Sequence, residues 1–159
     1  FRVGVEVGVE AGRYSESICE INSQMKLWGV DPYLKYDEYR EPYSQDNLDG
    51  IYQYMMDRMV SYRNHGRFEI IRKKSMDALA DFEDESIDFV YIDANHEFDF
   101  PLRDIEGWAK KVKKGGIVSG HDYVRIKALD FTIKDALKEY TIKNNISPWF
   151  VLGRFQKTR

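Results

Sequence analysis

The chain alternates between two patterns of apolar and polar residues. Short runs rich in β-branched and aromatic residues predict six strands: around Val3 to Val7, 26–30, 68–72, 86–93, 117–119 and 149–152. Between these runs, apolar residues recur three and four positions apart, which predicts helices over 13–23, over about 46–64, from Ser75, from Leu102 to the lysines at 110–114, and over 133–140. Gly115 and Gly116 are expected to end the fourth of these helices.

This alternation of strands and helices predicts an α/β fold with three layers, in which helices cover both faces of a mainly parallel sheet. The run 86–93 has a continuous apolar centre and is expected to be a central strand buried on both faces. Right-handed crossovers place the loops that follow the strands at one edge of such a sheet. Ligands of α/β proteins bind at that edge, so the residues just after each strand are the first candidates for a functional site.

Composition narrows the class of protein without identifying it. The 159 residues suit a single domain, 1–159, with 43% hydrophobic and 32% charged residues, which is ordinary for a soluble globular protein. The formal net charge of -3 disfavours nucleic acid as a partner, and no apolar run approaches the roughly 20 residues of a membrane span. The single cysteine, Cys19, excludes an internal disulfide and is consistent with the cytoplasm. Because the chain starts almost on its first strand, we expect residues upstream to be missing from this sequence; a homo-oligomer stays open.

The stretch that follows the first strand has the features of a ligand-binding loop. Gly8 and Gly12 allow positive φ angles and a close approach of a ligand to the main chain, and a helix start follows them. The glycine spacing fits neither the dinucleotide fingerprint, which would need a glycine at Glu10, nor a P-loop. Glu6, at the end of the strand, would repel phosphates but suits a ligand with an ammonium or sulfonium group. The alternative is a turn whose glycines only permit close packing.

Asp31 ends the second predicted strand about 20 residues after the glycine loop, where an acidic residue accepts hydrogen bonds from the two hydroxyls of a ribose. The alternative is that Asp31-Pro32 only starts a turn, but the register with the glycine loop favours the ribose. The tyrosine-rich stretch 32–46 is expected to be an irregular loop. It either covers a cofactor or substrate or lays its tyrosines on the domain surface.

Two further strand ends carry candidate ligands: Asp93 and His96 after the fourth strand, and His121 and Asp122 after the fifth. Adjacent parallel strands would bring Asp93 and Asp122 together, and paired carboxylates repel unless a cation lies between them or one is protonated. A hard divalent cation such as Mg²⁺ is the simplest solution, and it would lower the pKa of a bound substrate hydroxyl. His96 would then take the proton. The alternative is that these side chains cap helices and loops; no cysteine or closely spaced histidine pair favours zinc.

The stretch Ile-Asp-Phe-Val-Tyr-Ile-Asp-Ala-Asn-His-Glu-Phe at 87–98, together with Asp104, Trp108, Gly115-Gly116 and His121-Asp122-Tyr123, resembles class I S-adenosylmethionine-dependent methyltransferases. The spacing of Glu6, Gly8, Gly12 and Ser15 resembles their first cofactor motif. More narrowly, the chain is similar to bacterial methyltransferases related to macrocin-type and catechol-type O-methyltransferases and to cephalosporin-hydroxylase-like proteins. The resemblance implies a Rossmann-like methyltransferase fold whose sheet ends in a hairpin, so we expect the final strand to be missing from this sequence.

The resemblance also implies roles for single residues. Those expected around the methionine part of the cofactor are Glu6, Gly8, Gly12 and Ser15. Asp31 would hold the ribose, Ser75 and Met76 would flank the adenine, and Asp93 would serve the cofactor, the metal and catalysis. The expected metal ligands are Asp93, His121 and Asp122. The chain departs from the family pattern at three positions: Glu10 replaces a frequent glycine, His121 a carboxylate or amide, and His96 a catalytic lysine.

From these residues we expect methyl transfer from S-adenosyl-L-methionine to a hydroxyl of a small-molecule acceptor, assisted by Mg²⁺. Two alternatives stay open at this point. One is a metal-dependent hydroxylase-like relative that uses the same acidic site. The other is a non-catalytic nucleotide-binding module. The sequence does not identify the acceptor.

Overall fold

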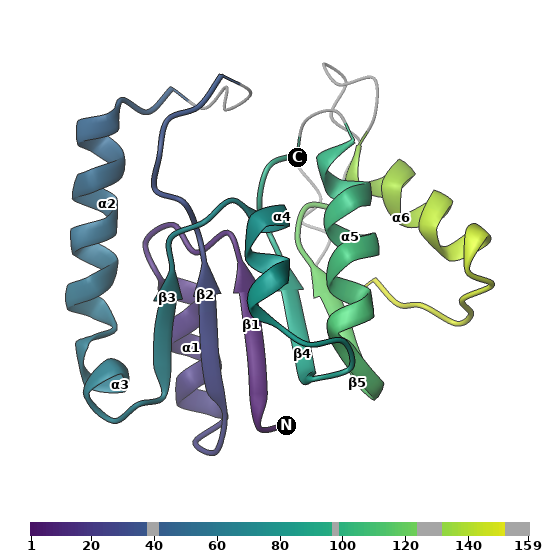
Figure 1. Ribbon diagram of the computed structural model, residues 1–159, viewed down its shortest axis with the longest axis horizontal. Helices are drawn as coiled ribbons and strands as arrows, with labels where there is room; N and C mark the ends of the chain where they lie inside the picture. The colour runs from purple at the N-terminus through teal and green to yellow at the C-terminus, as the bar shows by residue number, and fades with distance from the viewer. Residues whose placement is uncertain (38–41, 97–98, 124–131, 152–159) are drawn as a thin grey trace, which may run out of the picture.

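The computed structural model describes residues 1–37, 42–96, 99–123 and 132–151 (Figure 1). Its centre is a five-stranded sheet in the order β3-β2-β1-β4-β5. Every pair of neighbouring strands is parallel. The strands are β1 Val3–Val7, β2 Lys26–Val30, β3 Phe68–Ile71, β4 Ile87–Ile92 and β5 Val112–Gly120. The expected α/β fold with a parallel sheet is therefore confirmed.

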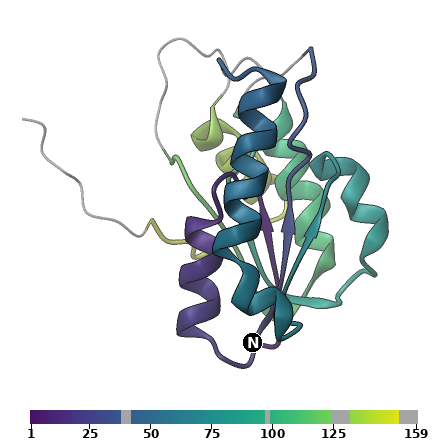
Figure 2. The same ribbon diagram turned by 90° about the vertical axis from the view of Figure 1, so that its left-hand side faces the viewer.

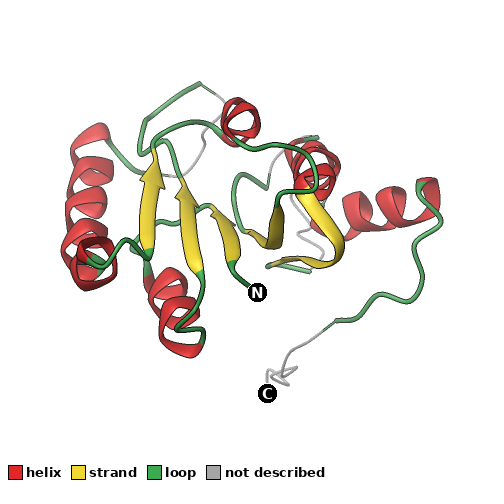
Figure 3. Ribbon diagram, turned by 60° about the horizontal axis from the view of Figure 1, so that its bottom comes forward, coloured by secondary structure: helices red, strands yellow, loops and turns green. Residues whose placement is uncertain are grey.

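Helices form the two outer layers (Figure 3). They are α1 Arg13–Ile21, α2 Gln45–Arg58, α3 Val60–Asn64, α4 Ser75–Ala78 with a 3₁₀ turn at Leu79–Asp81, α5 Phe100–Lys111 and α6 Ile133–Lys143. Helices α1 and α2 lie on one side of the sheet and α4 and α5 on the other (Figure 2), while α6 packs against α5. Among the described residues, no helix has the length and apolar character needed to cross a membrane.

The alternation of side chains along the strands divides the core into two clusters. Val5 and Val7 of β1 face α5 and pack with the fully buried Trp108. On the opposite face, Leu27 and Met55 belong to a second cluster, formed between β2, β3, α1 and α2. Because successive residues of a strand point to opposite faces, each layer of helices has its own apolar surface to cover.

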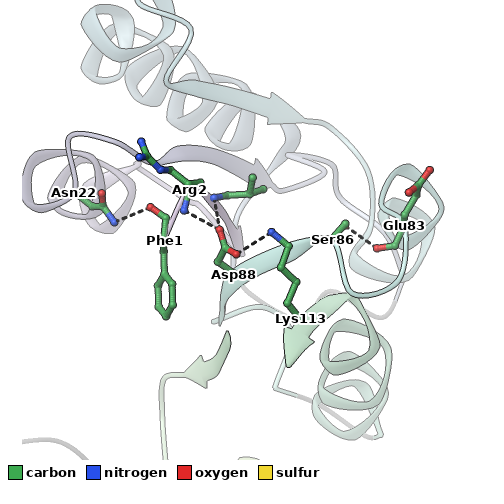
Figure 4. Close-up of polar contacts among 8 residues, drawn as sticks. Phe1, Arg2, Asn22, Glu83, Ser86, Asp88 and Lys113 are labelled. Carbon is green, nitrogen blue, oxygen red and sulfur yellow. Dashed lines mark hydrogen bonds and ion pairs between the residues drawn. The ribbon is translucent and has the colours of Figure 1, made fainter. Parts of the chain in front are cut away.

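A charged contact joins three strands at the amino edge of the sheet (Figure 4). The carboxylate of Asp88 in β4 accepts hydrogen bonds from the backbone N–H groups of Arg2 (2.7 Å) and Val3 (2.9 Å) and from Nζ of Lys113 (2.9 Å). The Lys113 ammonium, followed by the two N–H groups, lowers the pKa of Asp88 to about 2. This contact fixes the register of β1, β4 and β5 at the edge opposite the candidate site.

Two predicted helices differ from those in the structure. The helix expected over about 46–64 is divided at Met59, which caps both α2 and α3. The division keeps Met59 buried, while Val60 is 47% exposed. The helix expected to reach the lysines at 110–114 ends at Lys111, because Val112 already pairs with Ile87 in the sheet.

The remaining part of that region forms an irregular strand. The pairing of β4 with β5 shifts between Ile87 and Phe89, and Gly115 adopts a φ of +84° within the shifted segment. Glycine has no penalty at such an angle. Gly115 therefore sits within an irregular strand, whereas the sequence pattern predicted that it ends a helix.

The sixth strand, expected at 149–152, is wrong for residues 149–151, which form no strand; residue 152 lies outside the described part. Phe150 is 78% exposed, so its apolar side chain is not packed into a core. Trp149 instead packs against the ring of Tyr123, with ring centroids 5.4 Å apart. An apolar run without a described neighbouring strand has no ladder to join, which sequence periodicity alone does not reveal.

Candidate active site

Backbone hydrogen bonds hold the carboxyl ends of the five strands side by side. Asp31 N–H donates to the carbonyl of Ile71 and Gly8 N–H to that of Val30. Further across the sheet, Asp93 N–H donates to the carbonyl of Val7 and His121 N–H to that of Ile92. The predicted residues that follow β1, β2, β4 and β5 therefore lie at the same edge, drawn at the top of Figure 1.

The loop after β1 packs directly on the end of β4. Gly8 has a φ of +87°, and a Cβ atom at this position would lie 1.9 Å from the carbonyl oxygen of Asp93. Gly12, with a φ of +70°, caps α1, and a Cβ there would lie 2.9 Å from Cγ of Met55. Both glycines are required by packing as well as by backbone conformation. Close packing of these two glycines is therefore compatible with a role of the loop in ligand binding.

Two side chains after β2 hold this loop in place. Oδ2 of Asp31 accepts hydrogen bonds from the N–H groups of Val9 and Glu10, each at 3.0 Å. Glu10 has a φ of +48°, the left-handed region that a glycine would adopt freely. The hydroxyl of the buried Tyr33 donates to the Glu10 carbonyl at 2.8 Å. Asp31 and Tyr33 therefore hold the non-glycine residue in the conformation that the loop requires.

Asp31 keeps acceptor capacity although it holds the loop. Its Oδ1 accepts from the N–H of Tyr33 at 3.0 Å, an Asx-type turn. A carboxylate has about four lone-pair sites, so three backbone N–H groups leave room for a ligand hydroxyl. Burial raises the pKa of Asp31, and the three backbone hydrogen bonds oppose this shift. The Asp31 side chain can therefore stabilise the turn and contact a ligand at the same time.

Glu6 is a buried acid beneath the loop. It is 2% exposed, and the hydroxyl of Ser15 in α1 donates to its Oε2. Burial raises the pKa of Glu6 from 4.5 to about 8; the Ser15 hydrogen bond opposes the shift, and the charges of Asp93 and Asp31 add to it. Glu6 and Ser15, both predicted at the methionine part of the cofactor, therefore form one contact between β1 and α1.

Replacing Glu6 with glutamine is expected to flatten the pH dependence of stability. Because the folded-state pKa of Glu6 is raised, its contribution is complete below about 4.5 and is lost as the pH rises toward about 8. The free energy of unfolding of Glu6→Gln should therefore rise relative to that of the parent by up to about 1.4 kcal/mol for each pH unit in this window. Urea unfolding at several pH values measures it, with Glu20→Gln, exposed on α1, as the control. Parallel curves for Glu6→Gln and the parent would contradict the assignment.

Asp93, His96 and Asp122 converge at the ends of β4 and β5. Nε2 of His96 lies 3.5 Å from Oδ1 of Asp93 and 3.7 Å from Oδ2 of Asp122. One ligand atom from each of the three lies within 4.8 Å of the other two. His121 is more peripheral: its Nδ1 is 3.0 Å from Oδ1 of Asp122 and 3.9 Å from Oδ2 of Asp93, and its side chain is 60% exposed.

The surroundings of this cluster are strained and aromatic. Asp122 has a φ of +52°, a conformation that costs energy in a non-glycine residue and often marks functional positions. The ring of Tyr91 of β4 packs against that of the half-exposed Tyr14 of α1, with centroids 4.1 Å apart and the ring planes tilted by 36°. Burial, followed by the charge of Asp93, raises the pKa of Tyr91. Sequence analysis missed this pair, although Tyr91 stands two residues before Asp93 in the strand.

Ser75 begins α4, but its hydroxyl does not cap the helix. It donates to Oδ1 of Asp104 at 2.5 Å and accepts from Nε1 of Trp108 at 2.9 Å. Burial raises the pKa of Asp104 to about 6, which the Ser75 hydroxyl opposes. Met76 lines a separate hollow of about 270 Å³ beside α5. Asp104 and Trp108 are four positions apart and therefore lie on the same face of α5. This spacing of a carboxylate and an indole was the sequence signal for the network.

A parallel sheet in the order β3-β2-β1-β4-β5, with a glycine loop after β1 and an acidic residue after β2, is the arrangement of Rossmann-like folds. Residues 5–123 match the family model described as a methyltransferase domain, and the chain belongs to this family. The resemblance found in the sequence is confirmed.

Solved structures share the fold at low sequence identity. A provisionally assigned caffeoyl-CoA O-methyltransferase from Staphylococcus aureus aligns with a TM-score of 0.62 and 16% identity, over 91% of this chain and 67% of that one. Cofactor-bound Rv0187 from MTB aligns with a TM-score of 0.59 and 15% identity, over 89% and 59%. The uncharacterized protein y4gI of Sinorhizobium fredii is 25% identical over 120 residues, 76% of this chain. The chain spans 12% of the length of y4gI.

Proposed function

We propose that this domain transfers the methyl group of S-adenosyl-L-methionine to a hydroxyl oxygen of a small-molecule acceptor. One observation carries the proposal: the glycine loop touches the backbone of Asp93, so the expected cofactor loop and the Asp93–His96–Asp122 cluster adjoin. Membership of the methyltransferase family and the fold of cofactor-bound Rv0187 support it. A small molecule is the expected acceptor class, because the methyltransferase family favours it and the net charge of -3 disfavours nucleic acid.

The residues around the loop suit a positively charged cofactor. We assign Glu6, Gly8, Gly12 and Ser15 to the methionine part and Asp31 to the ribose, while the backbone at Ser75 and Met76 would border the adenine. The Ser75 hydroxyl is engaged with Asp104 and Trp108, so its part is to hold the first turn of α4. The charges of Asp31 and Asp93 both act on Glu6, so the three carboxyl groups lie near one another, and a sulfonium or ammonium group bound there would favour their ionised forms.

The acidic cluster fits a divalent cation. Metal–ligand bonds of about 2.0–2.2 Å separate neighbouring ligand atoms by about 3–4 Å, and one carboxylate oxygen of Asp93 lies within 4.8 Å of one of Asp122. We assign Asp93 and Asp122 as the ligands, with His121 beside them, and Mg²⁺ as the ion. When bound, such an ion lowers the pKa of a substrate hydroxyl and orients it. The carboxylates neutralise its charge.

His96 is the proposed general base. In the transfer step, the acceptor hydroxyl gives its proton to a ring nitrogen of His96 as its oxygen bonds to the methyl carbon. The carbon–sulfur bond breaks, its electron pair stays on sulfur, and S-adenosylhomocysteine leaves. Asp93 and Asp122 would stabilise the imidazolium that forms, since both lie within 3.7 Å of Nε2. Most of the acceleration would come from holding the oxygen in line with the methyl group.

Calorimetry with S-adenosylmethionine, with and without Mg²⁺, tests the proposed function first. We expect a micromolar dissociation constant, about -8 kcal/mol. Affinity that rises with Mg²⁺ would support the Asp93–Asp122 site. No binding in either condition, with S-adenosylhomocysteine also inactive as a ligand, would overturn the proposal.

Replacing Asp31 with alanine is expected to weaken S-adenosylmethionine binding at least about tenfold, because a ribose acceptor and two contacts of the loop are lost together. Calorimetry of Asp31→Asn with S-adenosylhomocysteine and its 2′-deoxy analogue separates the two effects. If Asp31 binds the ribose, loss of the hydroxyl costs affinity in the parent but less in the variant. The exposed Asp57→Ala serves as the control. Equal losses in parent and variant would remove the ribose assignment.

A further inference from the structure

A hollow of about 620 Å³ lies between the glycine loop and the first half of α2, away from the Asp93–His96–Asp122 cluster. Residues that line it include Ala11, Tyr43, Asp46, Gly50, Ile51 and Tyr54. Helix α2 lines one side of it, and Met55 of this helix packs against Gly12 of the loop. The roles assigned above to the strand ends do not use this hollow.

Gly50 is a glycine that packing does not explain. It lies inside α2, and a Cβ atom at this position would meet no other atom within 4 Å. At Gly12 and Gly29, in contrast, a Cβ would approach neighbouring side chains to 2.9 Å and 2.8 Å. Glycine destabilises a helix interior relative to alanine. With no side chain at position 50, the hollow stays open over this turn of α2.

Tyr54 is an exposed ring that the protein holds in a fixed place. It is 52% exposed, yet its hydroxyl accepts a hydrogen bond from Nη2 of Arg58 at 2.8 Å. The Arg58 guanidinium also lies 5.2 Å from the centroid of the same ring, and Glu16 neutralises its charge in an ion pair. These contacts orient the aromatic surface before any ligand arrives.

Asp46 supplies a negative charge beside the two phenol rings. Its carboxylate makes no hydrogen bond or ion pair with any residue in the described ranges, although its place in the first turn also suits the helix dipole. Aromatic faces next to a free carboxylate attract organic cations through cation–π and ionic contacts. The hollow therefore combines open volume, one oriented aromatic ring and a carboxylate that is unpaired among the described residues.

We infer that this hollow binds an ammonium group attached to an apolar ring, as the non-reacting part of the methyl acceptor. The statement that this ligand is the methyl acceptor rests on the proposed function, whereas the ammonium site itself does not depend on it. Binding energy from such a remote contact would position the hydroxyl at the catalytic cluster.

Nuclear magnetic resonance titration of the protein with benzylammonium and with neutral benzyl alcohol tests the ammonium site. We expect amide shifts at Gly50, Ala11 and Ile51, and about tenfold tighter binding of the ammonium compound. Asp46→Asn should remove this preference, whereas Asp49→Asn, whose carboxylate is already bonded to Gln45, should keep it. Equal affinities in the parent, a preference that survives Asp46→Asn, or shifts confined to the ends of β4 and β5 would overturn the inference.

Two variants at Gly50 separate the hollow from the fold. Gly50→Ala should raise the urea midpoint, since the added methyl group meets open space and favours the helix. Gly50→Leu should fill the hollow and lower benzylammonium affinity at least tenfold while S-adenosylmethionine affinity stays unchanged. Undiminished benzylammonium binding by a folded Gly50→Leu would reject the site.

Hydroxylated acceptors with and without an ammonium group then test the link to methyl transfer. In the parent, kcat/KM should favour the ammonium-bearing compounds at least tenfold, and Asp46→Asn should abolish this preference. Absence of S-adenosylmethionine binding would overturn the proposed function alone, because the titrations with benzylammonium do not involve the cofactor. Equal kcat/KM values in the parent would overturn the assignment to the acceptor.

Discussion

Replacing His96 with alanine is expected to lower the rate of methyl transfer by about 10²- to 10⁴-fold, the usual contribution of a positioned general base. The side chain lies between Asp93 and Asp122, where it would both accept the acceptor proton and be stabilised once charged. Cofactor affinity should stay within about twofold of the parent, because the proposed base contacts the acceptor. Single-turnover kinetics with labelled S-adenosylmethionine measures the rate, and calorimetry measures the affinity.

The same variant distinguishes a base from a metal ligand. If His96 is a base, calorimetric Mg²⁺ affinity is retained in His96→Ala, and activity returns in part with added imidazole. His65→Ala, exposed at the end of α3, is the matched histidine control. Full turnover in His96→Ala would reject the base. Loss of metal affinity together with turnover would reassign His96 as a ligand.

Replacing Gly8 with alanine is expected to lower the free energy of unfolding by about 3 kcal/mol or more, from a left-handed conformation and a steric clash together. The new Cβ would lie 1.9 Å from the carbonyl oxygen of Asp93 and 2.6 Å from its carbonyl carbon, so a strand end would have to move. Because Asp93 belongs to the catalytic cluster, we expect a loss of cofactor binding as well. Urea unfolding measures the stability.

Gly66→Ala provides the control for this change. Gly66 has a φ of +67°, but a Cβ there would meet no atom within 4 Å. The free energy of unfolding of Gly66→Ala should therefore fall only by the cost of the left-handed conformation, about 1–2 kcal/mol. The excess loss in Gly8→Ala is then the effect of the contact with Asp93. Similar losses at both positions would show that the loop and the end of β4 separate easily.

The parts of the fold that follow from local patterns were predictable. The valines at 3, 5 and 7 gave a strand whose alternate side chains enter the core, and the alternation of strands with helices gave the parallel sheet. The end of α5 was not predictable, because Lys110 to Lys114 suit a helix end whereas the pairing of Val112 with Ile87 is a tertiary contact. The strand predicted at 149–151 failed for the same reason, because a strand forms only where a neighbouring strand can pair with it.

The candidate site was predictable as a set of positions, since parallel strands bring their ends to one edge. The partners of each side chain were not. Asp31 was expected to face a ribose, and no pattern in the sequence shows that it also holds Val9 and Glu10. The engagement of Ser75 with Asp104 depends on how α4 packs against α5, a contact between positions 29 residues apart.

The contacts of Asp31 and Tyr33 with Glu10 have a kinetic consequence. They shape the loop in the free protein, so the chain has little backbone order left to acquire when a ligand arrives. Association of the cofactor should then be a single step whose observed rate rises linearly with concentration, without the plateau that a slow loop rearrangement produces. Differences in affinity among variants of this loop would appear mainly in the residence time of the cofactor.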